Sequence, residues 1–236
     1  MAGMIYFNNA ALEFVAPQIK VVDVRVSPIS MAVTSRQRAT LPGSEFVRVV
    51  GRSRTVEVSF ALLERNLQAR QDALLAVTQW ARSDGPGKLQ LPGHDGRYLE
   101  AICTALPEPS TRQWWESKLR IVFTTMQNPF WTDEIEKSAA CGTAFYVTGS
   151  APPLMQITRT LSDAATNQSY TDGTHTMTFS AIPAGDLVID LNRQTAAVGT
   201  SSIMSAYGFT SSFIPPVTGG MTITGTGTVR WRERWE

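Results

Sequence analysis

Residues 55–91 read TVEVSFALLERNLQARQDALLAVTQWARSDGPGKLQL, and this stretch decides the fold. Residues 55–63 alternate between apolar and polar side chains, which predicts a strand because successive side chains point to opposite faces of a sheet. From Glu64 to Ser83 the apolar side chains take the three- and four-residue spacing of an amphipathic helix. Glycine and proline at 85–87 end that helix, and residues 88–91 leave it as a second strand.

One face of this helix is expected to cover a sheet. Its stripe is formed by Leu67, Leu74 and Val77, which follow Leu63 at helical spacing, and Leu75 and Trp80 widen the stripe. Almost every other part of the chain has the pattern of strands and turns. The sequence therefore predicts a strand–helix–strand unit inside a mainly β protein.

Composition places the 236-residue chain among ordered proteins that bury a core, with 43% hydrophobic and 17% charged residues. The net charge of +1 is too small to predict nucleic-acid binding from charge alone. No apolar run approaches the about 18 residues of a transmembrane helix, and the first residues lack the pattern of a signal peptide. Cys103 and Cys141 are far apart, which favours two thiols over a disulfide.

A change of composition near residue 140 predicts two domains, 1–140 and 141–236. Residues 1–140 carry 16 Lys and Arg, whereas residues 141–236 carry 5, together with 17 Thr and 10 Gly. The second composition is typical of half-exposed strands joined by tight turns. We expect a first domain of α+β type, a sheet or sandwich with one packed helix, and a second domain that is an antiparallel β-sandwich.

Residues 31–41 (MAVTSRQRATL) are polar and basic, and they lack an apolar face long enough for a core strand. We interpret them as an extended arm or loop. Residues 42–44 then make a turn, and residues 46–50 begin the strand pair that leads to the helix.

Basic and aromatic side chains of the first domain are candidates for an oligomer interface, because Arg and Trp are enriched at such surfaces. The alternative role of the arginines is solubility and protection of strand edges. Trp114 and Trp115 are adjacent, so on a strand they face opposite sides and one of them lies outside the core. The candidate interface residues are Arg36, Arg38, Arg48, Arg52, Arg54 and Trp114.

No catalytic constellation can be assembled from the sequence. His94 and His175 fall in different predicted domains, and neither has a second His or Cys at metal-binding spacing. Asp186 and Asp190 share one face of a predicted strand, which leaves a cation site open as a weaker alternative. We therefore expect no enzymatic activity, no cofactor, and no catalytic or metal-binding residues.

The last strand, residues 228–235 (TVRWRERW), alternates strictly. Its period predicts that Val229, Trp231 and Trp235 face a core and that the arginines face solvent. A groove for nucleic acid, with interleaved Trp and Arg, is the less favoured interpretation.

Several of these segments, in this order, resemble the distal tail protein family of long-tailed, non-contractile bacteriophages. The resemblance begins in residues 51–102, from GRSRTVEVSF to the strand that starts at Tyr98, and continues in WESKLRIVFTTMQNPFW at 115–131. It closes with AGDLVIDLNRQTAAV at 184–198 and with the terminal TVRWRERW.

The resemblance implies a structural protein of the virion tail, made in the host bacterial cytoplasm. Its β-rich first domain would form a six-membered ring, and its second domain would be a galectin-like sandwich. The ring would join the tail tube protein to tail-tip, tail-associated or receptor-binding proteins, with DNA only passing through the centre and no membrane anchor. Two alternatives stay open at this point: a glycan- or host-surface-binding module of a phage tail, and a hub component of a contractile injection machine.

Overall fold

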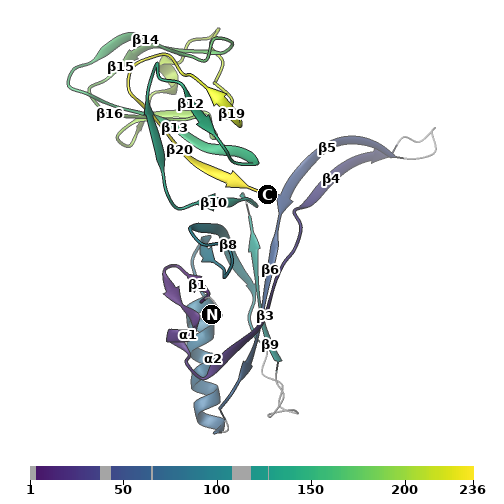
Figure 1. Cartoon of the computed structure of the whole chain (residues 1–236). Coiled ribbons are helices and arrows are strands. Elements are labelled where there is room, and N and C mark those ends of the chain that lie inside the picture. Colours follow the sequence, from purple (N-terminus) through teal and green to yellow (C-terminus); the bar gives the residue numbers. More distant parts are fainter. Residues whose placement is uncertain (1–3, 38–43, 65, 108–117, 127) are drawn as a thin grey trace. The chain divides into compact units, whose positions relative to one another are not determined.

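The computed structural model describes residues 4–37, 44–64, 66–107, 118–126 and 128–236, with the backbone alone at 32–37, 44–51 and 118. The chain is mainly β and divides into two compact units, Met1–Trp131 and Thr132–Glu236 (Figure 1). The boundary predicted at residue 140 falls inside the second unit. The reason is β11 (Lys137–Ala140), which pairs with the final strand β20 (Thr228–Trp235) of that unit.

The first unit contains an antiparallel sheet with the strand order β2-β1-β7-β8-β9-β6-β3. The strands are β1 (Tyr6–Phe7), β2 (Ala10–Ala11), β3 (Ile19–Val26), β6 (Thr55–Leu62), β7 (Gly87–Gln90), β8 (Arg97–Ala105) and β9 (Lys118–Thr125). Strand β6 buries Val56, Val58 and Phe60 completely, as its alternating pattern predicts. The predicted strand–helix–strand unit is therefore confirmed.

Helix α2 (Leu67–Ala81) is shorter than predicted, and Asn66 caps its first turn by accepting a hydrogen bond from the Gln68 backbone N–H at 2.9 Å. The face predicted to cover the sheet is right at Val77 and Trp80, which are buried together with Ala73 and Ala81. It is wrong at Leu67 and Leu75, which are 68% and 57% exposed, and Leu74 is only half-buried.

The N-terminal segment explains which face of α2 is buried. The indole N–H of Trp80 donates to the Ala10 carbonyl at 2.8 Å, and the Trp80 ring packs edge-on against Phe7 of β1 and Phe123 of β9. Short helix α1 (Leu12–Val15) also contacts α2 and buries Leu12. Residues 5–12 thus complete the core of the first unit, a role that the sequence pattern did not reveal.

Alternation in residues 18–26 (QIKVVDVRV) predicts a strand with Val22, Val24 and Val26 on one face, and β3 departs from that pattern. A bulge between Val21 and Asp23 breaks the period of two, so Val22 is 50% exposed and does not share a face with half-buried Val24 and Val26. Strand β3 pairs with β6 on one side, and the described residues provide no partner strand on its other side.

The second unit is a sandwich around one apolar core. Its larger sheet has the order β18-β17-β16-β13-β20-β11, and it is faced by the strand pairs β14-β15 and β12-β19. The remaining bounds are β10 (Trp131–Asp133), which straddles the unit boundary, β12 (Phe145–Val147), β13 (Ala151–Leu161), β14 (Ala165–Thr171), β15 (Thr176–Ile182), β16 (Gly185–Asp190), β17 (Thr195–Val198), β18 (Ser201–Ser202), the 3-10 helix η1 (Met204–Ala206) and β19 (Gly219–Met221). The core includes Ile157, Phe179, Ile189 and Trp231. Residues 203–207 (IMSAY), whose sequence predicts a short strand, contain η1 instead.

Candidate assembly surface

A long hairpin extends from the sheet of the first unit as an arm. The part within the sheet is the β3–β6 pair, and the part beyond the sheet is the pair formed by β4 (Ser30–Gln37) and β5 (Ser44–Ser53). Figure 1 shows β4 and β5 running together beyond the rest of the first unit. We call β4 and β5 the arm. Of the arm or loop expected at 31–41, residues 31–37 belong to one strand of a two-stranded ribbon, and residues 38–41 lie outside the described residues.

The root of the arm is fixed by hydrogen bonds. The backbone N–H of Ser27 donates to the Thr55 carbonyl, and the Thr55 N–H returns a bond to the Ser27 hydroxyl, both at 2.8 Å. On the other side, the Arg54 N–H donates to the fully buried hydroxyl of Thr125 at 2.8 Å. The Ser30 hydroxyl also contacts the Ser53 carbonyl at 3.1 Å. These bonds set the direction in which the arm leaves the sheet.

The arm forms a separate two-stranded sheet. Its strands have 8 and 10 residues, which corresponds to roughly 26–33 Å at about 3.3 Å per residue. Two bulges, between Ala32 and Val33 and between Thr34 and Ser35, add local twist. An isolated two-stranded ribbon is marginally stable in water, so this arm gains most from a partner that covers it.

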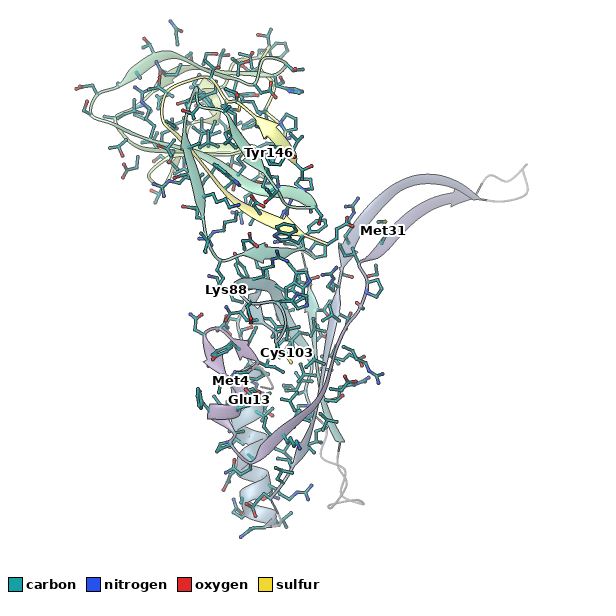
Figure 2. The ribbon with its side chains drawn as sticks, in the orientation of Figure 1. Met4, Glu13, Met31, Lys88, Cys103 and Tyr146 are labelled. Atoms are coloured by element: carbon teal, nitrogen blue, oxygen red, sulfur yellow. The ribbon has the colours of Figure 1, made fainter. Side chains whose placement is uncertain are left out.

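The predicted interface residues do not share one environment. Arg52 is exposed at the root of the arm, directly opposite Met31 on the paired strand, which is labelled in Figure 2 and is 57% exposed. Arg36 and Arg48 lie in β4 and β5, where only the backbone is described. Arg38 and Trp114 lie outside the described residues.

Arg54 is the exception among these candidates. It lies between β5 and β6, and its side chain is only 6% exposed, so it belongs to the interior rather than to the surface. Its charge acts on His94, whose pKa is lowered first by burial and then by the guanidinium groups of Arg97 and Arg54. The His94 ring stacks on Trp131 with 3.8 Å between centroids, which gives this histidine a packing role.

Exposed apolar side chains supply further contact area on the first unit. Phe14 of α1 is 73% exposed, and Leu67 and Leu75 on the outer side of α2 are 68% and 57% exposed. The sequence pattern placed Leu67 in the core. Only the structure shows that it is available at the surface.

The final strand of the second unit is engaged within its own unit. Arg230 contacts the Glu136 carboxylate at 3.1 Å, Arg232 donates to the Asp133 carbonyl, and the Trp235 indole N–H donates to the Asp133 carboxylate at 2.9 Å. Trp231 is buried, as predicted. Because these side chains are engaged within the unit, the strand is poorly suited to bind a polyanion.

Glu233 lies on the same face as buried Trp231, and although it carries a charge it is only 1% exposed. Its carboxylate accepts hydrogen bonds from the Lys137 ammonium at 2.6 Å and from the Thr148 hydroxyl. Burial alone would raise the pKa of Glu233, but the bonds from Lys137 and Thr148, with the Lys137 charge, outweigh burial and lower it.

We expect Glu233→Gln to lower the stability of the second unit by about 1–2 kcal/mol at pH 7, because the change removes the charge that pairs with Lys137. The loss is limited to this size because Lys137 is 43% exposed and keeps access to water. Since the folded pKa is lowered, the contribution is complete above the ordinary Glu pKa of about 4.3 and is lost as the pH falls through the folded pKa. Thermal unfolding at pH 7 and in acid, below the ordinary Glu pKa, checks this. Glu136→Gln, at a surface pair, is the control and should change stability by less than about 0.5 kcal/mol. If Glu233→Gln lowered stability equally at pH 7 and in acid, the ionised carboxylate would not be the source of the stability, which would contradict this explanation.

Other polar groups considered from the sequence have local partners. His175 contacts the Asp172 carboxylate at 3.1 Å, and Asp172 also caps the backbone N–H groups of Thr174 and His175. Asp186 accepts a bond from the Thr160 hydroxyl, while Asp190 accepts bonds from the N–H groups of its own turn. The described part of the chain holds no group of three or more His, Cys, Asp or Glu suited to a metal ion.

Cys103 and Cys141 are free, half-buried thiols, and burial raises the pKa of each. Within the described ranges, no helix is both long and apolar enough to cross a bilayer.

No family model matches the chain, and no curated protein matches it. Among solved structures, the SPP1 Dit (gp 19.1) protein superposes with a TM-score of 0.72 over 99% of this chain and 99% of that chain, at 16% sequence identity. The chain has the SPP1 Dit fold. SPP1 Dit is described as a paradigm of the hub adsorption apparatus in phages that infect Gram-positive hosts.

Two structures of the phage P2 baseplate in its activated conformation, with Ca and with Sr, match with a TM-score of 0.44 at 8% identity. The superposition covers 93% of this chain and 91% of the baseplate chain. The match to SPP1 Dit runs through both units, so it accounts for the sheet with its helix and for the sandwich together.

Proposed function

We propose that this protein is a structural hub component of a phage tail, placed where the tail tube meets the tail tip. The observation that carries the proposal is the SPP1 Dit fold, which extends through both units and 99% of each chain. The proposed place is the virion tail, and the proposed partners are the tail tube protein and tail-tip or receptor-binding proteins. The role is one of assembly, without catalysis.

The proposed assembly is a ring of six copies around a central channel. A closed ring needs a head-to-tail contact in which one surface meets a different surface of the next copy. The arm is the first of these surfaces, because it extends beyond the sheet of the first unit and, among the described residues, its two strands pair only with each other. The open edge of β3 and the exposed Phe14, Leu67 and Leu75 are candidates for the second. The number six comes from the family resemblance.

The charge of the chain suits the passage of DNA through such a ring. Strong binding to DNA requires many Lys or Arg contacts to phosphate, each of which releases counterions. With a net charge of +1, the chain has no general attraction for DNA that would hold it in transit.

A host-glycan module is the second candidate from the sequence, and the structure gives it less support. Of the two tryptophans of the final strand, the candidate stacking platforms for a sugar, Trp231 is packed in the core and Trp235 donates a hydrogen bond to Asp133.

Gold-labelled antibodies against the protein test the proposed location on particles of the phage that encodes it. We expect labels at the distal end of the tail, where tube and tip meet. Labels along the whole tube, on the capsid, or absent from intact and tip-stripped particles alike would contradict the proposal.

A further inference from the structure

The sheet of the first unit has two faces of different chemistry. Helix α2 lies along one side of strands β3, β6 and β9 (Figure 1), and on that side β6 and β9 bury Val58, Phe60 and Phe123. The positions between these buried residues point to the opposite side, because side chains alternate along a strand. We call that side the outer face. It is formed by Asp23 and Arg25 of β3, Glu57 and Ser59 of β6, and Arg120 of β9.

The charges of the outer face form pairs of opposite sign. The Arg25 guanidinium lies 2.7 Å from the Asp23 carboxylate, and the Arg120 guanidinium lies 3.3 Å from the Glu57 carboxylate. The register also sets Arg25 directly opposite Glu57 on the paired strand. All four side chains are at least 36% exposed. The outer face is therefore charged residue by residue, but nearly neutral as a surface.

This pairing bears on binding more than on folding, because exposed ion pairs contribute little to stability. A phosphate is held when Lys or Arg neutralises it and counterions are released. A carboxylate beside each guanidinium occupies its donors and repels a second anion. With Asp23 and Glu57 in place, Arg25 and Arg120 are thus poor ligands for a polyanion.

The opposite side of the first unit has the chemistry of a protein contact. Phe14, Leu67 and Leu75 are exposed there, on α1 and α2. Apolar side chains of this kind supply the core of protein–protein interfaces, whereas a water-filled passage needs a hydrated wall. The outer face supplies such a wall, and it offers a passing polyanion few sites at which to be held.

We propose that the outer face lines the path of DNA, and that Asp23 and Glu57 keep this wall from binding DNA by neutralising Arg25 and Arg120. The inference rests on the proposed function, which supplies the channel. It adds a specific role for two carboxylates: they make the wall inert rather than attractive to the duplex.

Binding of labelled duplex DNA of about 30 base pairs to the purified full chain tests the role of the carboxylates. The double variant Asp23→Asn, Glu57→Gln keeps the side-chain shapes and frees both guanidinium groups. Fluorescence anisotropy should show at least about tenfold tighter binding than the wild-type chain at about 0.05 M salt, with the gain lost on raising salt to about 0.2 M. Adding Arg120→Gln should reverse most of the gain.

The matched control removes two negative charges from the second unit. Asp163→Asn with Asp186→Asn changes the net charge by the same amount at exposed positions. Its binding to DNA should equal that of the wild-type chain, because no guanidinium of the outer face is freed. Circular dichroism should show all variants folded, since every substituted side chain is exposed or half-buried.

A photoreactive diazirine side chain tests the position of the outer face in the particle. Placed at Ser59, between the two ion pairs, it should crosslink to DNA when particles are irradiated during genome release onto host cells. The same side chain at Leu75, on the opposite side of the first unit, should not.

A double variant that binds DNA no more tightly than the wild-type chain, or a control that gains as much, would overturn the proposal. So would crosslinks from position 59 to another tail protein alone, or crosslinks to DNA from position 75. Particles that contain the chain and release DNA without a crosslink at position 59 would contradict this inference alone. Tails that never contain the chain would contradict the proposed function itself.

Discussion

Val77→Asp should unfold the first unit. Val77 lies in the middle of α2 with 0% exposure, so an aspartate there would be a buried charge without an opposite charge. Such a change costs on the order of 4 kcal/mol or more, a large part of the total stability of an ordinary domain. Chemical denaturation followed by circular dichroism measures the loss.

Leu75→Asp is the matched control for this prediction. It introduces the same charge two residues away on the same helix, but Leu75 is 57% exposed. Both variants place one aspartate in the middle of the same helix, and Leu75→Asp gives up the better helix former, so a larger loss for Val77→Asp must come from burial. Equal stability of the two variants would show that α2 does not pack on the sheet as described. Leu74, which the sequence placed in the buried stripe, is half-buried and should give an intermediate loss.

Removal of the arm should abolish the ring without unfolding the first unit. Ser30 and Ser53 are paired across the arm's root, so a two-residue Asn-Gly turn can replace residues 31–52 and close the hairpin there. The bonds of Ser27, Thr55 and Thr125 below the cut remain in place. We therefore expect a folded single copy in place of the proposed ring.

Light scattering with size-exclusion chromatography measures the effect of arm removal, and the thermal midpoint serves as its control. The midpoint should stay within a few degrees of the intact chain, a shift equivalent to about 1 kcal/mol or less. A shortened chain that still assembles into the same ring would mean that the arm is not the contact that closes it.

The periodic parts of the sequence predicted the fold well, because burial imposes a period that can be read directly. Strand β6 and the final strand 228–235 lie where their alternation placed them. The buried face of α2 was missed because Phe7 and Ala10, far away in sequence, select it through Trp80. The bulge in β3 has no signal in a single sequence, since it depends on how the partner strand β6 pairs.

The candidate assembly surface was only partly predictable. A polar, basic stretch indicated an arm, but nothing in residues 31–41 showed that it pairs with β5 as a ribbon. Arg54 was grouped with surface arginines because charge favours exposure, yet the adjoining backbone bonds to buried Thr125 and carries its side chain inward. Glu233 was missed for the same reason, since a carboxylate is expected outside, and fully exposed Phe209 for the converse reason, since an apolar residue is expected inside.

Cryo-electron microscopy of the purified full chain tests the central claim most directly. We predict closed rings of six copies with a central opening, in which the arm of each copy contacts its neighbour. Single copies at micromolar concentration, or open filaments without closure, would contradict it.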